Sequence, residues 1–361
     1  MTEITLVLPS ALPPPELAAD LVRALQTPSL ASLLTRTARH QVLPVDEQVR
    51  ALPHESWLAQ HLGLVESGQP AFAISAMRGF GLPAAGGAWF IVNPAHIEIA
   101  RSHLLMADMR RLQLGEAHSR ALFDTAKPYF DEAGKMLLYG DAHTWFMLAD
   151  DWTDLLTSTP DAATGLNLTD WLPKGPNARE FRKLQNEVQM LWFEHPANVE
   201  REARGLAAIN SFWPWGLAAQ AAPAASPTAA ATSRSTNALA TSDAPAWLAA
   251  IAQQQPATLS ALFAASNSGA NNGANSGAGH TTLVCDSLSA AANAADWSTW
   301  LMQMHRLEET VFAGALAAVR QGRVKQLTLL LSRRGAHSAF TTTSLAQRTF
   351  WRRPTLNRLL P

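Results

Sequence analysis

The chain has 361 residues, of which 47% are hydrophobic, and its formal net charge is −1. This length and apolar content support a sizeable core, so we expect a folded protein with one large domain or two smaller ones. The near-neutral charge excludes bulk electrostatic capture of nucleic acid or of an anionic membrane as the main mode of binding.

The single cysteine, Cys285, excludes an internal disulfide framework and a four-cysteine zinc site, and it is typical of a reducing compartment. The first residues, MTEITLVLPSALPP, lack the basic start and the long apolar run of a signal peptide. No later stretch reaches the length of uninterrupted apolar residues that a membrane span needs. We therefore expect a cytoplasmic location and no membrane partner.

The first part of the chain has the pattern of an α/β fold. Ile4 to Leu8 is apolar and rich in β-branched residues, is followed by Pro9, and predicts a buried strand. A helix is expected over residues 15–24. A second helix follows Thr27, the expected N-cap, with Pro28 at the first helical position. A strand followed by helices favours an α/β core.

The middle of the chain predicts a mixed α+β module. Short strands and one helix are expected at 88–92, 97–100, 115–129 (the helix), 136–139 and 144–148. The strongest signal is Ala178 to Glu194, where apolar residues recur every three or four positions, as on one face of a helix. This face should pack on the core.

Two segments after Gly216 have a composition that does not support a packed core. Residues 217–246 are mostly Ala, Pro, Ser and Thr, and residues 267–279 contain only Asn, Gly, Ser and Ala. Such segments bury too little apolar surface to offset chain entropy. We predict disordered loops, with a short helix at 247–265 between them; a recognition role for the loops is the alternative.

The last part returns to the α/β pattern. A strand is expected at 282–285, a long helix at 296–319, and at 324–331 a buried strand of the kind that parallel sheets use. We therefore predict a core of residues 1–78 plus 205–361, with an inserted α+β domain at 79–204.

A dense block of His, Asn, Arg and Trp, with the sequence QMLWFEHPANVEREARGLAAINSFWPWG, extends from Gln189 to Gly216. Guanidinium groups bind carboxylate or phosphate as a fork, and imidazole and amide groups add directional hydrogen bonds. These residue types predict a site for a small phosphorylated metabolite. The candidate substrate-binding residues are His195, Asn198, Arg201, Arg204 and Asn210.

The alternative interpretation of this block is structural. Arg201 and Arg204 would then pair with Glu200 and Glu202 or with the preceding helix, while His195 caps its own helix.

The segment His195 to Gly216 resembles one in archaeal-type, cofactor-independent phosphoglycerate mutases, where His-Pro-x-Asn precedes Arg, Gly, Pro-Ala-Asn and a Gly-ended apolar turn. Weaker similarities occur in the order of that family. They are LVLPSAL at its first strand and metal-binding Asp, TPSLASLL at its Thr-Pro-Asn-Leu helix, LPHESWLAQHLGL at its nucleophile turn, AWFIVNPAHIEI at its Ala-Phe-Arg-x-Asn strand, and LVCDSL near its later metal-ligand strand.

This family belongs to the alkaline phosphatase superfamily. The resemblance therefore implies an alkaline-phosphatase-like sheet core and two divalent metal ions, Mn²⁺ or Mg²⁺, held by Asp and His. It also implies a Ser or Thr nucleophile that accepts a phosphoryl group.

The metal and nucleophile positions of this chain depart from the family pattern. Ser10 stands at the first ligand position, and Ser332-Arg333 replaces the last Asp-His pair. His54 stands at the nucleophile position, and only Asp286 remains of the later Asp-Glu-x-x-x-His motif. Hard divalent cations need several carboxylates or imidazoles. We expect a degenerate two-metal site with at most a retained pocket for a phosphorylated acid; the alternative is an active metal-dependent mutase or phosphatase.

Further polar groups are weaker candidates. His54, Glu55 and Ser56 offer an acid, a base and a nucleophile, with a solvated loop as the alternative. An acidic patch near Trp152 predicts either a cation site or an exposed turn. Its members are Asp150, Asp151 and Asp154.

Other features have a structural explanation. We expect lone His118 and His143, and the Cys285 thiol, to be structural. The 12 tryptophans predict core and inter-domain packing, with ligand stacking as the alternative. Residues 310–361 contain nine Arg or Lys and no acidic residue, which predicts a solvated basic face rather than a nucleic-acid contact.

Overall fold

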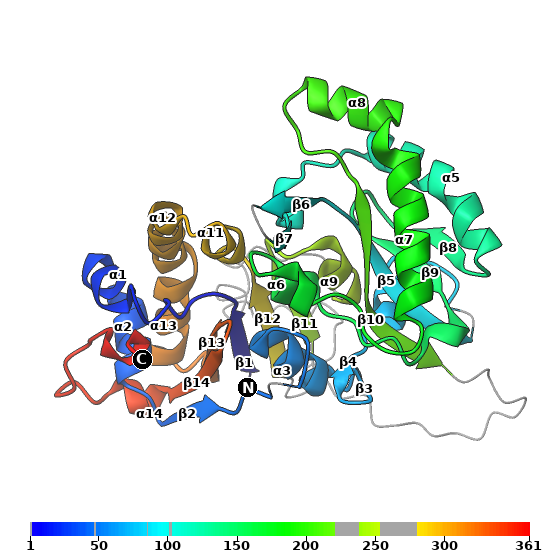
Figure 1. Cartoon of the computed structure of the whole chain (residues 1–361). Coiled ribbons are helices and arrows are strands. Elements are labelled where there is room, and N and C mark those ends of the chain that lie inside the picture. The colour runs from blue at the N-terminus through cyan, green and yellow to red at the C-terminus, as the bar shows by residue number, and fades with distance from the viewer. Residues whose placement is uncertain (1, 47, 85, 101–102, 221–237, 253–279) are drawn as a thin grey trace, which may run out of the picture. The chain divides into compact units, whose positions relative to one another are not determined.

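The computed structural model describes residues 2–46, 48–84, 86–100, 103–220, 238–252 and 280–361 (Figure 1). Its backbone forms two compact units, and each is described by itself. The described parts of the first unit are 2–46, 238–244, 252 and 280–361, and those of the second are 48–84, 86–100, 103–220 and 245–251. Residues 48–78 and 205–220, assigned to the core from the sequence, pack in the second unit, so the predicted boundaries do not coincide with those of the units.

The first unit is built on a six-stranded sheet with the strand order β11-β12-β1-β13-β14-β2. The strands β11, β12, β1 and β13 are parallel to their neighbours, while β14 and β2 are antiparallel. The elements are β1 (Thr2–Leu8), α1 (Ala18–Ala24), α2 (Pro28–Thr35), β2 (Arg39–Leu43), β11 (Ala238–Ser242), β12 (His280–Cys285), α11 (Ser289–Asn293), α12 (Trp297–Leu307), a π-helical turn (Glu308–Phe312), α13 (Ala313–Arg320), β13 (Val324–Arg333), β14 (Ala336–Thr343) and α14 (Ser344–Gln347). The mixed α/β character predicted from the sequence is confirmed.

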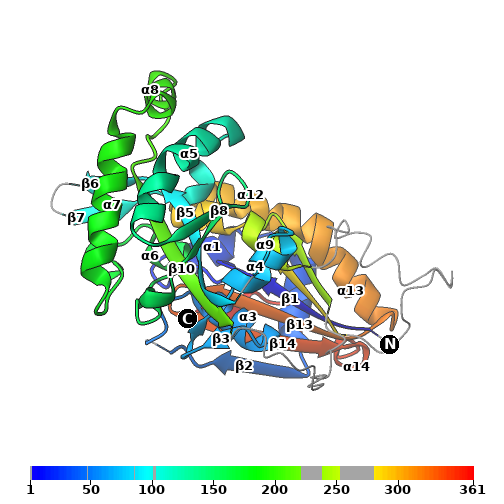
Figure 2. The same cartoon turned by 90° about the vertical axis from the view of Figure 1, so that its right-hand side faces the viewer.

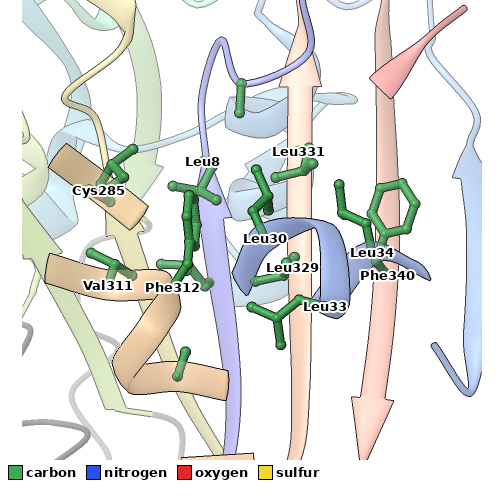
Figure 3. Packing of buried hydrophobic residues seen from close by; sticks show 14 of the residues in the cluster. Leu8, Leu30, Leu33, Leu34, Cys285, Val311, Phe312, Leu329, Leu331 and Phe340 are labelled. Carbon is green, nitrogen blue, oxygen red and sulfur yellow. The ribbon is translucent and has the colours of Figure 1, made fainter. Parts of the chain in front are cut away.

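The core of this unit lies on one face of the sheet. Because side chains alternate along a strand, Leu6 and Leu8 of β1 and Leu329 and Leu331 of β13 share that face. Figure 3 shows how α2 and the turn carrying Phe312 pack against these strands. Burial of this apolar layer is the main stabilising contribution to the unit.

The predicted start of α2 is confirmed, with Thr27 at the N-cap position and Pro28 as the first helical residue. Thr27 makes no side-chain cap bond, however, and its hydroxyl is buried without a partner. The Glu308 carboxylate instead accepts hydrogen bonds from the N–H groups of Ser29 and Leu30, at 2.7 and 3.1 Å. Glu308 begins the π-helical turn that interrupts the predicted long helix, so this turn places the carboxylate at the start of α2.

The second unit is built on a four-stranded antiparallel sheet with the order β10-β5-β9-β8 (Figure 1). Its elements are α3 (Pro53–Leu62), β3 (Val65–Glu66), β4 (Gln69–Pro70), α4 (Ala73–Gly79), β5 (Gly87–Ala95), β6 (Ile97–Ala100), β7 (His103–Met106), α5 (Glu116–Glu132), β8 (Met136–Tyr139), β9 (Trp145–Leu148), α6 (Pro160–Ala163), α7 (Ala178–Phe193), α8 (Pro196–Ala203), β10 (Ser211–Gln220) and α9 (Ala246–Ile251). The expected strands and helices of the middle segment are thus present.

Different helices pack on the two faces of this sheet. On one face, α5 and α7 lie side by side (Figure 2), and the apolar stripe predicted for residues 178–194 is buried there through Phe181, Leu184 and Val188. On the other face, α4 packs against α9 and β10. At Gly79 of α4 a Cβ atom would lie 1.8 Å from the carbonyl oxygen of Ala250, so only glycine permits this approach.

The loop prediction for residues 217–246 is wrong at both ends. Residues 217–220 continue β10, and 238–242 form β11, which pairs with β12. The small side chains of these residues do not form the apolar pattern that predicts a strand. Backbone hydrogen bonds to an existing sheet stabilise the strands instead. The first part of the helix predicted at 247–265 lies in α9 (Ala246–Ile251), while residues 253–265 and the predicted loop at 267–279 lie outside the described residues.

In the part of the chain that the structure describes, no helix has both the length and the apolar character needed to cross a membrane.

Candidate functional site

The block from Gln189 to Gly216 forms the end of α7, the helix α8 and the start of β10. His195 is the N-cap of α8, since its Nδ1 accepts a hydrogen bond from the N–H of Ala197 at 3.1 Å. Its other ring nitrogen lies 3.1 Å from the Thr125 hydroxyl, and burial lowers the pKa of the imidazole. The capping role considered for His195 is confirmed.

The two asparagines of the block bond to backbone. The side chain of Asn198, 1% exposed, donates to the carbonyls of Trp192 and Ile209 and accepts from the N–H of Ile209. Asn210 bonds in the same two-way manner to Ile97, at 2.8 Å for each bond. Both amides therefore hold loops in place.

Arg201 is fully buried, with 0% of its surface exposed. Its Nε donates to the carbonyl of Ala207 at 3.0 Å, and its two terminal nitrogens donate to those of Gln113 and Leu112, at 3.2 and 2.6 Å. Burial lowers the pKa of its guanidinium, with a smaller contribution from the charge of Arg204. A ligand at Arg201 would have to displace these carbonyls, so the contacts support the structural interpretation.

Arg204 is exposed and lies 3.9 Å from Glu200, as the structural alternative expected. The same Glu200 carboxylate lies 3.1 Å from His118. None of the five candidate residues of the block lines the cavity at Glu55 or the one at Arg50, both of which lie in the second unit.

The carboxyl ends of the parallel strands in the first unit carry the positions where the resemblance places metal ligands. In open α/β sheets ligands bind at this edge. Ser10 follows β1 with a φ of 58°, and its hydroxyl lies 3.4 Å from that of Ser289. The Ser289 hydroxyl in turn donates to the carboxylate of Asp286, and Asp243 follows the neighbouring strand β11.

Hard divalent cations bind mainly carboxylate and carbonyl oxygens, and a two-metal centre needs several of them. Ser10 and Ser289 supply neutral hydroxyls, and only Asp286 and Asp243 supply carboxylates. Among the described residues, no group of three or more His, Cys, Asp or Glu side chains is placed to hold a metal ion. Asp243 was missed from the sequence because its segment has a loop-like composition.

The predicted cluster His54, Glu55 and Ser56 lies in the first turn of α3, not on a solvated loop. The Ser56 hydroxyl donates to the carbonyl of Leu52 at 3.2 Å, which is one helical turn earlier. His54 and Glu55 are 8% and 5% exposed. Of the three, Glu55 lines a cavity of about 150 Å³ in the second unit.

This cavity, which we call the Glu55 cavity, opens beside the sheet face that α4 and α9 cover. Its polar and aromatic wall residues include Glu55, Asn93, Arg110, His143, Asp161 and Trp247. They come from α3, β5, the 3₁₀ turn Met109–Arg111, the loop before β9, α6 and α9.

One oxygen of the Glu55 carboxyl is held by the protein. Oε2 accepts hydrogen bonds from the N–H of Leu52 at 2.7 Å and from the Thr159 hydroxyl at 2.6 Å. Burial raises the pKa of Glu55 to about 8, and the charge of Asp161 acts in the same direction. At neutral pH Glu55 is therefore mainly a neutral carboxylic acid, which can donate a hydrogen bond.

The other polar groups of the cavity are paired or neutral. The Arg110 guanidinium donates two parallel hydrogen bonds to the Asp161 carboxylate, at 2.6 and 2.7 Å. Burial lowers the pKa of His143, so its ring is neutral at pH 7. Asn93 accepts a hydrogen bond from the Trp215 indole and donates one to the carbonyl of His143. The sequence signal for these residues was absent, because they are far apart in the chain.

Two members of the acidic patch, Asp150 and Asp151, have structural partners, and the Cys285 sulfur lies 3.6 Å from the Ser287 hydroxyl. Asp150 accepts from the N–H of Ala88 at 2.7 Å, and Asp151 forms an ion pair with Lys135. Cys285 is buried, which raises the pKa of its thiol.

Comparisons with known proteins give structural similarity alone. No protein-family model matches the chain, and no curated protein matches it by sequence. The chain is similar to the PH0037 protein from Pyrococcus horikoshii, with 11% identity and a TM-score of 0.53 over 94% of this chain and 87% of the other. A cofactor-independent phosphoglycerate mutase from Thermoplasma acidophilum matches 95% of this chain and 90% of its own, with 14% identity and a TM-score of 0.44. The first similarity shows a shared fold; the second has too low a TM-score to carry an argument.

Proposed function

We propose that this chain is a phosphoglycerate mutase-like protein with a degenerate metal centre, and that it binds a small ligand in the Glu55 cavity. The observation that carries this proposal is Glu55 itself. A carboxyl group that is 5% exposed, with one oxygen fixed by Thr159 and Leu52 and a raised pKa, lines a cavity of ligand size. Titratable groups with perturbed pKa values in a pocket are typical of binding and catalytic sites.

The resemblance of the chain to the mutase family supports the scaffold half of the proposal. The donor set at the sheet edge supports the other half, because Ser10 and Ser289 supply hydroxyls in place of carboxylates and the Asp286 carboxylate accepts a hydrogen bond from Ser289. Binding without metal-dependent phosphoryl transfer is the function that these residues support best.

The first experiment separates binding from turnover. The full chain is purified, loaded with Mn²⁺ or Mg²⁺, analysed for bound metal, and assayed with 3-phosphoglycerate and a general phosphatase substrate. We expect neither stoichiometric metal nor turnover. Metal-dependent mutase or phosphatase activity would overturn the degenerate centre and favour the active-enzyme alternative.

The second experiment locates the binding. Ala246 lines the cavity on α9, while Ala249 of the same helix is exposed and does not line it. A thermal-shift screen of small metabolites, 3-phosphoglycerate included, is run on the native chain and on Ala246→Phe and Ala249→Phe. The proposal expects a stabilising ligand whose effect is lost only in Ala246→Phe; a screen in which both variants respond like the native chain would contradict it.

A further inference from the structure

The size of the Glu55 cavity limits its ligand. Its volume is about 150 Å³. An engineered cavity of about 150 Å³ in an unrelated protein holds benzene. A single six-membered ring with one small substituent therefore matches the space, whereas a dinucleotide or a long chain does not.

The walls of the cavity suit a flat ring. Trp215 and Trp247 contact each other edge to face, with ring centroids 4.9 Å apart, and Phe72 packs on Trp247 at 5.0 Å. Met109 and Pro160 add apolar surface to the lining. Aromatic rings packed in this way hold their orientation and offer faces and edges to a further ring.

The charges of the cavity cancel. The guanidinium of Arg110 is bound through both terminal nitrogens to the Asp161 carboxylate, so the one cation of the lining already has its counter-ion. A ligand carboxylate or phosphate would have to compete with Asp161 for the Arg110 guanidinium. Taking a charged ligand out of water without a new counter-ion is costly.

The Glu55 carboxyl leaves one oxygen for a ligand. Oε2 of Glu55 is engaged by Leu52 and Thr159, and Oε1 takes part in neither bond. Because two donors already occupy Oε2, the proton of the neutral acid belongs on Oε1, where it can be donated to an acceptor in the cavity.

We infer that the Glu55 cavity takes an uncharged, benzene-sized aromatic or heteroaromatic ring whose substituent accepts a hydrogen bond from the Glu55 carboxyl. This inference rests on the proposed function and specifies its ligand class. It differs from the phosphorylated acid expected from the sequence.

The test compares three ligands with the same ring and different charge. Benzamide is neutral, benzoate is an anion, and benzylamine is a cation at pH 7. Their affinities for the full chain are measured by isothermal titration calorimetry or ligand-observed NMR. We expect benzamide to bind at least tenfold more tightly than benzoate or benzylamine, with binding lost in Ala246→Phe and kept in Ala249→Phe.

The pH dependence gives a second readout. The charged and titratable groups that line the cavity with Glu55 are Arg110, Asp161 and His143. Because Glu55 loses its proton as pH rises through about 8, benzamide affinity should fall above that pH. In Glu55→Gln, whose amide keeps a donor without titrating, the affinity should not change between pH 7 and 9.

The outcomes separate the two proposals. Benzoate could bind as tightly as benzamide or more tightly, and lose this binding in Ala246→Phe. That result overturns the neutral-ring inference but leaves the cavity as the binding site. If no probe or metabolite binds in a manner that Ala246→Phe abolishes, the proposed function fails together with this inference.

Discussion

Arg201 and Glu55 are both buried ionisable residues of the second unit, but they differ in what they leave for a ligand. Arg201 donates to the carbonyls of three loop residues and has no exposed surface. Glu55 has one oxygen bound by the protein and lines a cavity. The residue types of a motif are therefore not sufficient for a binding site. A binding site also needs a polar atom without a protein partner next to a cavity.

The largest expected effect is that of Arg201→Met. The substitution keeps much of the apolar stem but leaves the carbonyls of Ala207, Gln113 and Leu112 without their donor. We expect a loss of about 3–5 kcal/mol in the free energy of unfolding, because each buried unsatisfied acceptor costs about 1–3 kcal/mol. Urea unfolding measures it. A loss below about 1 kcal/mol, with weaker binding of 3-phosphoglycerate, would instead make Arg201 a ligand residue.

Gly79→Ala tests the cavity wall through a residue of α4 that does not itself line the cavity. The new Cβ would lie 1.8 Å from the Ala250 carbonyl oxygen, so α4 and α9 must separate and move Trp247. Overpacking of this kind costs about 1–3 kcal/mol, and benzamide binding should weaken with it. Gly335→Ala is the matched control, because no heavy atom lies within 4 Å of its added Cβ. Unchanged stability and affinity in Gly79→Ala would contradict the close α4–α9 contact.

The pH dependence of the unfolding free energy of Glu55→Gln tests the raised pKa of Glu55. A group with a pKa of about 8 in the folded chain and 4.5 in the unfolded chain holds its proton longer when folded. Its stabilising contribution is complete below pH 4.5 and is lost as pH rises through about 8. The unfolding free energy of the native chain should therefore fall over this window by on the order of 5 kcal/mol more than that of Glu55→Gln. Parallel pH profiles for the two proteins would show that Glu55 ionises normally.

The smallest effect is expected for Arg204→Ala. Arg204 is exposed, and its pair with Glu200 spans 3.9 Å. Exposed pairs on a helix contribute about 0.5 kcal/mol or less, so stability and benzamide affinity should both stay within error. Loss of binding to any phosphorylated acid in this variant would move the ligand site back to the central block.

Periodic elements were predictable from the sequence because their cause is local. The apolar stripe of α7 and the apolar run of β1 correspond closely to observed bounds. The strands β2 and β14 were missed, since β2 is largely exposed and its sequence, Arg39–Leu43, has no apolar alternation. The pairing of β14 with β13, and of β2 with β14, is a tertiary effect that a local pattern does not contain.

The candidate site was less predictable for a related reason. Arg110 and Asp161 are 51 positions apart in the chain, and Asn93 and Trp215 are 122 apart. Only Glu55 carried a sequence signal, as part of a cluster whose other members, His54 and Ser56, do not line the cavity. Conversely, the Arg-rich block had the clearest motif but uses its polar groups to hold backbone.

A crystal structure of the full chain grown with benzamide tests the central claim most directly. We predict a ring packed against the aromatic wall that Trp215 and Trp247 form together, with the amide oxygen within hydrogen-bond distance of the Glu55 carboxyl. Benzamide bound beside His195, Arg201 or Arg204, with the Glu55 cavity holding none, would contradict it.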